Sequence, residues 1–144
     1  MKVLSHIKLA ARLEYLQTFM DFVSSCAGEQ GFGQKGINEI ELATEEALVN
    51  IFNYAYKGTN GEVEITCKLD NNNNFILEIA DSGFPFNVLS VEDPDITADI
   101  SERQIGGLGV LLMKKLTDSV QYRYEGDKNI LTLIFLKIKV ISDK

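Results

Sequence analysis

The chain has 144 residues, of which 45% are hydrophobic and 24% charged, a balance that suits one domain over residues 1–144 with a substantial core. Its net charge of −7 disfavours nucleic acid as a direct partner, and no apolar run approaches the roughly 20 residues of a membrane span. A single histidine and two cysteines in unrelated contexts predict no zinc cluster, catalytic triad or disulfide scaffold, which favours a reducing, cytoplasmic location.

The first half of the chain predicts one strand followed by two helices. Residues 3–9 alternate apolar and polar, as a half-buried strand does, and residues 10–29 then change to a helical period. After a glycine-rich break, residues 37–56 place an apolar stripe on one face of a second helix, which residues 57–61 end.

The next part predicts a hairpin, an irregular segment and a third helix. Residues 62–69 and 75–80 have strand patterns and are joined by an Asn-rich turn. Residues 86–105 lack periodicity, which is typical of a lid or a disordered insert. Residues 106–116 then predict a helix that begins at a glycine-rich run.

The order of the elements predicts the fold class. Two closing strands, residues 119–124 and 130–140, complete an order without regular βαβ alternation, which disfavours a parallel Rossmann sheet. We therefore expect an α+β, two-layer sandwich, with a mixed, mainly antiparallel sheet covered by helices on one face.

Two polar residues on the second helix form the first candidate site. Glu46 and Asn50 are four residues apart and project together, whereas Glu45 points about 100° away around the helix. A carboxylate and an amide so placed could hold a water and Mg²⁺, which prefers oxygen ligands, and Asn53 continues the same stripe. The competing interpretation is a polar helix edge that faces solvent.

Asp81, Ser82 and Gly83 form the second candidate site, at the end of an apolar strand. The Asp81 carboxylate could accept a hydrogen bond from the exocyclic amine of a nucleotide base, and the glycine would allow close approach. A plain turn at the end of a strand would explain the same residues.

The glycine-rich run is the third candidate. Gly106, Gly107, Leu108 and Gly109 would expose backbone N–H groups at a helix start, where the helix dipole favours phosphate. Arg103, just before the run, could pair with the same phosphates. The alternatives are a flexible hinge for the glycines and an ion pair with nearby carboxylates for Arg103.

The order of these three motifs along the chain is more specific than any one of them. The segment from Glu46 to Asn50, the turn from Asp81 to Gly83 and the glycine-rich run resemble the N, G1 and G2 boxes of the GHKL (Bergerat-fold) ATPases. The likeness is closer to the small anti-sigma-factor serine kinases of the RsbW and SpoIIAB type, and it covers nearly the whole chain.

The resemblance implies a site for ATP or ADP with Mg²⁺. It implies that Glu46 is the general base and Asn50 a Mg²⁺ ligand. It implies that Asp81, supported by Gly83, contacts adenine. It also implies that Gly107 and Gly109 form the phosphate loop and that Arg103 is a lid cation near the γ-phosphate. It also implies phosphorylation of an anti-anti-sigma (STAS) protein, control of a sigma factor by partner switching, and a homodimer. The alternative is a nucleotide-binding protein that sequesters its partner without useful kinase activity.

The chain departs from the family pattern at two places. Phe84 and Pro85 stand where the G1 box usually continues to a second glycine, and Tyr54 stands where many relatives have histidine. Pro85 removes a backbone N–H and stiffens the segment. These departures concern lid movement and nucleotide affinity rather than the general base or the metal ligand.

Overall fold

The computed structural model describes residues 1–56, 60–90 and 105–137, with the backbone alone described for residues 105–108. In chain order the elements are β1 (Lys2–Ala10), η1 (Leu13–Tyr15), α1 (Leu16–Glu29), α2 (Gln34–Tyr54), β2 (Glu62–Leu69), β3 (Phe75–Asp81), η2 (Val88–Ser90), α3 (Ile105–Leu116), β4 (Ser119–Glu125) and β5 (Lys128–Phe135). In the described part of the chain, no helix has the length and apolar character that a membrane crossing needs.

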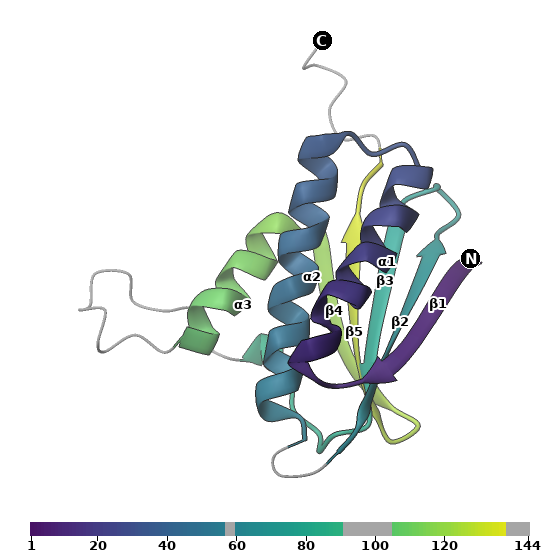
Figure 1. Cartoon of the computed structure of the whole chain (residues 1–144). Coiled ribbons are helices and arrows are strands. Elements are labelled where there is room, and N and C mark those ends of the chain that lie inside the picture. Colours follow the sequence, from purple (N-terminus) through teal and green to yellow (C-terminus); the bar gives the residue numbers. More distant parts are fainter. Residues whose placement is uncertain (57–59, 91–104, 138–144) are drawn as a thin grey trace.

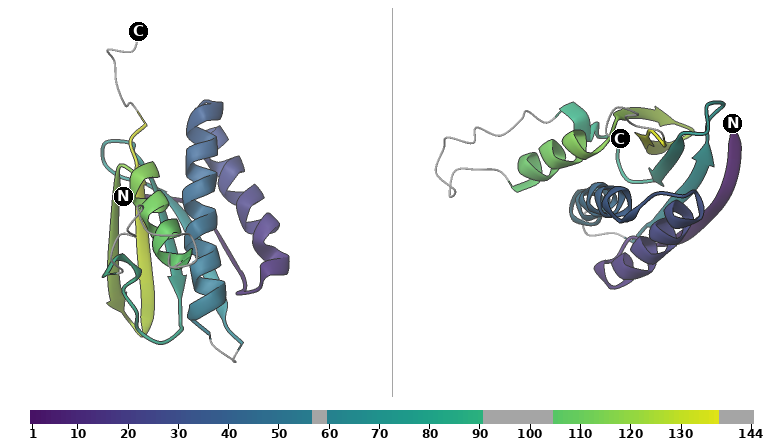
Figure 2. Two further views of the ribbon diagram at one scale, coloured as in Figure 1. Left: turned by 90° about the vertical axis from the view of Figure 1, so that its left-hand side faces the viewer. Right: turned by 90° about the horizontal axis from the view of Figure 1, so that it is seen from above.

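The five strands form one sheet in the order β1-β2-β3-β5-β4. All four strand pairings of the described residues are antiparallel, so the sheet contains no parallel pair among them. The expected α+β class is confirmed. The three α-helices cover one face of the sheet, and α2 lies between α1 and α3 (Figure 1). Figure 2 shows the two layers edge-on, as the sequence predicts.

The core lies between these layers and follows from the alternation in the strands. Every second residue of β2, β3 and β5 points toward the helices and is buried: Val63, Ile65, Cys67, Phe75, Leu77, Ile79, Leu131, Leu133 and Phe135. The apolar stripe of α2 packs against them through Ile40, Ala43, Ala47 and Leu48. Because α2 is fixed along its length by this packing, it provides a rigid support for side chains at its edge.

Element boundaries differ from the prediction where tertiary pairing overrides local pattern. β1 continues to Ala10, which pairs with Glu62, so α1 begins at Leu16 and not at residue 10. α2 begins at Gln34, three residues before the predicted start, directly after its N-cap Gly33. The last strand ends at Phe135, so its predicted extension is wrong at residues 136 and 137, while residues 138–140 lie outside the described part of the chain.

The two cysteines, expected in unrelated contexts, are neighbours in the core. Cys26 of α1 and Cys67 of β2 are buried free thiols, and each affects the pKa of the other. Burial raises the pKa of both thiols above the ordinary value. Both therefore remain protonated at neutral pH and pack as small apolar residues.

Candidate functional site

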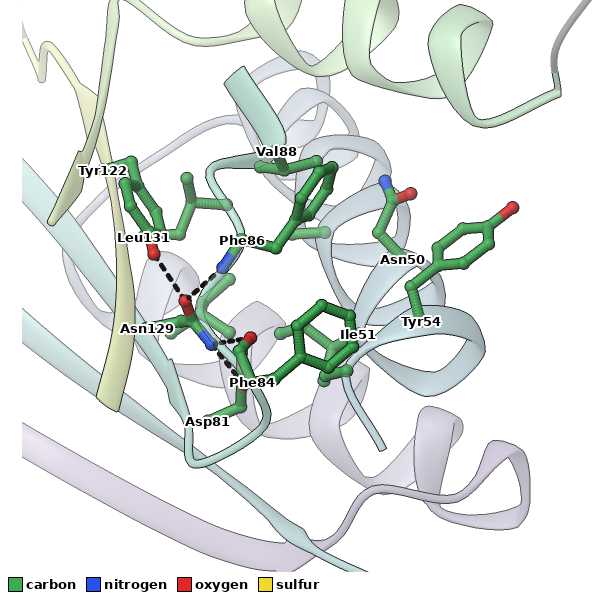
Figure 3. Close-up of a pocket in the computed structure, with 13 residues that line it drawn as sticks. Asn50, Ile51, Tyr54, Asp81, Phe84, Phe86, Val88, Tyr122, Asn129 and Leu131 are labelled. Atoms are coloured by element: carbon green, nitrogen blue, oxygen red, sulfur yellow. Dashed lines mark hydrogen bonds between the residues drawn. The ribbon is translucent and has the colours of Figure 1, made fainter. Parts of the chain in front are cut away.

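A pocket lies between the C-terminal half of α2 and the ends of β3 and β5 (Figure 3). Its cavity volume is about 60 Å³. Its walls are largely aliphatic and come from Ala47, Ile51, Ile79, Val88 and Leu131. Asn50 and Asp81, candidates from two separate motifs, both line it. The fold therefore brings Asn50 of the first candidate site to the same pocket as Asp81 of the second, whereas Glu46 does not line it.

Asp81 is the one charged residue among those described as lining this pocket, and it is 6% exposed. Its Oδ1 accepts hydrogen bonds from the backbone N–H of Gly83 at 2.9 Å and from Asn129 Nδ2 at 3.0 Å. Burial raises the pKa of Asp81, and the two hydrogen bonds partly offset that effect. A carboxylate held in this way among apolar walls is suited to accept a hydrogen bond from a ligand amine.

The turn that follows β3 packs tightly against the end of α2. A Cβ atom on Gly83 would lie 2.3 Å from the Ala55 carbonyl oxygen and 2.7 Å from the Ala55 Cβ, so only glycine fits. The Tyr56 hydroxyl ties the same turn, because it accepts from the Ser82 N–H at 2.6 Å and donates to the Glu62 carbonyl at 2.7 Å. The close approach predicted for Gly83 is thus an approach to the protein's own helix.

Three aromatic side chains surround the mouth of the pocket (Figure 3). Tyr54 is 44% exposed, Phe84 54% and Phe86 47%, and all three line the pocket. Phe84 belongs to the departure from the G1 pattern, and Phe86 follows it directly after Pro85. Exposed rings beside an apolar pocket offer flat surfaces on which a planar ligand can stack.

The predicted general base lies where α3 approaches α2. Glu46 is half-buried, and its pKa is raised by burial and further by the charge of Glu45. A Cβ atom on Gly109 would lie 2.3 Å from Glu46 Oε2, so glycine at this position lets the α3 backbone come up to the carboxylate. A carboxylate with a raised pKa is a better proton acceptor than an ordinary one.

The other predicted residues divide between the pocket, the surface and the third helix. Asn50 lines the pocket and donates through Nδ2 to the Glu46 carbonyl at 3.0 Å, and no described residue donates to its Oδ1. Asn53 is exposed and does not line the pocket. Residues 106–108, which are Gly106, Gly107 and Leu108, form the first turn of α3, and Arg103 lies outside the described residues.

Magnesium fits this set of donors as an ion shared with a bound phosphate. The described residues contain no group of three histidine, cysteine or acidic side chains placed to hold a metal. Mg²⁺ commonly keeps several waters and takes one or two protein oxygens together with phosphate oxygens. The Oδ1 of Asn50, close in the helix to Glu46, matches that mode of binding.

Asn129 of β5 lines the pocket but belongs to none of the motifs that predict the site. It is 7% exposed and lies directly opposite Asp81 in the sheet. Its position faces the core, in register with Leu131, Leu133 and Phe135 farther along the strand. A polar residue in an otherwise apolar face was the available indication, because a buried amide requires partners.

Comparison with known proteins agrees with this fold and site. Residues 9–135 match the family described as histidine kinase-like ATPase domain. The serine-protein kinase RsbW of Bacillus thuringiensis (strain Al Hakam) is 30% identical over 141 residues, or 95% of this chain and 88% of that protein. The RsbW of Listeria monocytogenes serovar 1/2a is 25% identical over 142 residues, or 95% and 90%. The chain therefore belongs to the histidine kinase-like ATPase family, in its RsbW-type group.

Two solved structures share the fold. The crystal structure of the RsbU and RsbW domains of Rv1364c from Mycobacterium tuberculosis matches with a TM-score of 0.63 and 17% identity. That match covers 92% of this chain and 32% of the longer chain. The histidine kinase domain of a blue-light activated histidine kinase from Erythrobacter litoralis EL346 matches with a TM-score of 0.53 and 14% identity, over 83% of this chain and 64% of the other. At these identities the likeness concerns the fold alone.

Proposed function

We propose that this chain is an ATP-dependent protein serine/threonine kinase that phosphorylates an anti-anti-sigma (STAS-domain) partner and so controls its own hold on a sigma factor. The observation that carries the proposal is that one helix, α2, supplies both a wall of the Asp81 pocket and the Glu46 carboxylate beside α3. Relatives named serine-protein kinase support the reaction class. Regulation of transcription in the cytoplasm is part of this proposal, since sigma factors act there.

The Asp81 pocket would receive the adenine base. The exocyclic amine of adenine is a hydrogen-bond donor, and Asp81 is the charged acceptor in an otherwise mostly apolar lining. The aliphatic walls would cover the faces of the base, and the aromatic rings at the mouth would lie next to its open edge.

The phosphates would extend from the pocket toward the first turn of α3. Helix N-termini bind phosphate through free N–H groups and the helix dipole, and Gly106, Gly107 and Gly109 would leave that backbone accessible. Arg103 would add a positive charge near the γ-phosphate. Mg²⁺ bound with Asn50 would supply further charge neutralisation, which is the main requirement of phosphoryl transfer.

Glu46 would act on the acceptor. As the serine or threonine oxygen forms its bond to the γ-phosphorus, the bond from that phosphorus to the bridging β,γ-oxygen breaks, and ADP leaves with the electron pair. The hydroxyl proton would pass to Glu46, whose raised pKa suits it to receive one. The γ-phosphoryl group ends on the partner, and the changed charge alters the partner's affinity for the kinase.

Two measurements test this function in sequence. A thermal shift with ATP or ADP, with and without Mg²⁺, tests binding: nucleotide at 100 times its dissociation constant should stabilise the fold by about 2.7 kcal/mol. Transfer of labelled phosphate from ATP to a purified STAS partner then tests catalysis. The absence of a thermal shift at millimolar nucleotide would contradict nucleotide binding, on which the whole proposal depends. Binding of ATP and partner by the wild-type protein without transfer would favour the alternative, sequestration without kinase activity.

A further inference from the structure

Asn129 is a buried amide at the centre of the hydrogen bonds around the pocket (Figure 3). Its Nδ2 donates to Asp81 Oδ1 at 3.0 Å, to the Phe84 carbonyl at 3.1 Å and to the Gly83 carbonyl at 3.3 Å. The two N–H bonds of the Asn129 amide are thus shared among three acceptors on one side of it. The donor capacity of Asn129 is fully used within the protein.

The acceptor side of the amide is occupied as well. Asn129 Oδ1 accepts from the Phe86 backbone N–H at 3.1 Å and from the Tyr122 hydroxyl. Because both of its polar atoms are paired inside the protein, Asn129 has no group left over for a ligand. Any effect of Asn129 on a ligand is therefore exerted through the groups that it holds.

The first of these groups is the Asp81 carboxylate. Asn129 and the Gly83 N–H both donate to Oδ1, while Oδ2 accepts no hydrogen bond from the described residues. This division fixes the rotation of the carboxylate about its own axis and leaves one oxygen for a donor from outside the protein. A buried carboxylate oxygen is costly without a partner, so it favours a ligand that brings an N–H group.

The second group is the segment that departs from the G1 pattern. The carbonyl of Phe84 and the N–H of Phe86 are both bonded to the one amide, on either side of Pro85. The backbone on both sides of the proline is thereby tied to β5. The two exposed phenylalanine rings consequently stay at the mouth of the pocket, where they are seen in Figure 3.

We propose that Asn129 is a positioning residue for base recognition, which turns Asp81 Oδ2 toward an exocyclic amine and holds the Phe84–Phe86 segment at the pocket mouth. This inference rests on the proposed nucleotide binding and adds the residue that makes the site selective. A base with an amine at the Asp81 position is favoured over a base with a carbonyl oxygen there, since that oxygen would face a carboxylate.

Paired nucleotides test the selectivity. Dissociation constants for ATP and for inosine triphosphate, which carries an oxygen in place of the amine, are measured for wild type, Asn129→Ala and the isosteric Asn129→Asp. Wild type should prefer ATP, and both variants should lower that preference about tenfold, because both lose the amide N–H that holds the Asp81 carboxylate in one orientation. Thr132→Ala, on the same strand but facing away from the pocket, is the matched control and should keep the wild-type ratio. Equal losses for the two nucleotides, or an unchanged ratio, would overturn the proposal.

Hydrogen exchange tests the hold on the segment without any nucleotide. Asn129→Ala removes the acceptor of the Phe86 N–H and should speed exchange of that amide about tenfold, whereas Asn129→Asp keeps an oxygen there and should preserve protection. Unchanged Phe86 exchange in Asn129→Ala would overturn the proposal even if affinities changed. If wild type binds neither nucleotide, the proposed function and the selectivity both fail. The exchange data still show separately whether Asn129 holds the Phe84–Phe86 segment.

Discussion

The two ends of the candidate site are built in different ways. At the proposed base-binding end, called the base end below, Asp81, Asn129 and the following turn form a closed set of hydrogen bonds between neighbouring strands. At the proposed catalytic end, Glu46 and Gly109 come from two helices that approach each other, and the Glu46 carboxylate accepts no hydrogen bond from the described residues.

The difference shows how one small domain can combine recognition with reaction. A carboxylate fixed by two donors keeps one orientation and can discriminate between bases. A carboxylate that no described residue holds by a hydrogen bond can turn toward a proton and receive it. Changes at the catalytic end should therefore reduce phosphate transfer and leave base binding intact. Changes at the base end should weaken base binding and leave the transfer step intact.

The largest effect is expected at Glu46. Glu46→Gln keeps the size of the side chain but removes the proton acceptor, so phosphate transfer should fall by about 10²- to 10⁴-fold. The rate is measured in a single turnover with labelled ATP and a STAS partner, and the ATP dissociation constant should change little. Transfer at the wild-type rate would show that another group takes the proton.

Gly109→Ala should affect the same end less strongly. The new Cβ would lie 2.3 Å from Glu46 Oε2, and because a flexible side chain can move aside, the fold should persist while the carboxylate is displaced. A displacement of this kind should lower transfer by about tenfold to a hundredfold. In a double-mutant cycle with Glu46→Gln, Gly109→Ala should add almost nothing. Full additivity would mean that the glycine acts independently of Glu46.

Gly83→Ala should damage the base end and the fold together. Its Cβ would meet the backbone of Ala55, which cannot move aside cheaply, so the free energy of unfolding should fall by about 1–3 kcal/mol. ATP affinity should fall as well, because the turn carries a donor to Asp81. Gly28→Ala on the exposed side of α1, with nothing within 4 Å of the added atom, should instead stabilise by up to about 1 kcal/mol. Denaturant unfolding of both variants decides the matter, and equal stabilities would be evidence against the close packing.

The smallest effect is a change in the pH dependence of stability at Asp81. Its pKa in the folded protein is raised above the ordinary value of 3.8, so the native state binds more protons than the unfolded state in that range. The contribution of Asp81 to stability is therefore greatest below the unfolded pKa and is lost as the pH rises through the folded pKa. The unfolding free energy of wild type minus that of Asp81→Asn should fall as the pH rises from about 3 to 7. A difference that grows with pH would reverse the sign and show that the hydrogen bonds outweigh burial.

Much of the fold could be predicted because its determinants are local. The alternation of β2 and the long stripe of α2 give the elements directly, and motif order led to the family. The helix predicted from residue 10 was wrong at its start because pairing of Ala10 with Glu62 is a contact between distant parts of the chain. Helical spacing cannot reveal such a contact.

The candidate site, too, could be predicted only where its residues lie on one element or in one short stretch of the chain. Glu46 and Asn50 share a helix edge because of spacing alone, and Asp81 stands at the end of its strand, so all three could be proposed from the sequence. Asn129 lies 48 residues beyond Asp81 and meets it only because β5 pairs with β3. For the same reason the sequence could not predict that the thiols of Cys26 and Cys67 are neighbours, since their contexts in the chain are unrelated.

The sequence by itself determined the elements, the family and the residues that carry the expected chemistry, since each depends on residue type and short spacing. Only the tertiary structure decided which oxygen of Asp81 is occupied, why Gly83 must be glycine, how Gly109 lets α3 approach Glu46, and which amide holds the pocket mouth. These features depend on atoms of distant segments that meet within a few ångströms. Such distances are set by sheet register and helix packing, and these exist only once the chain has folded.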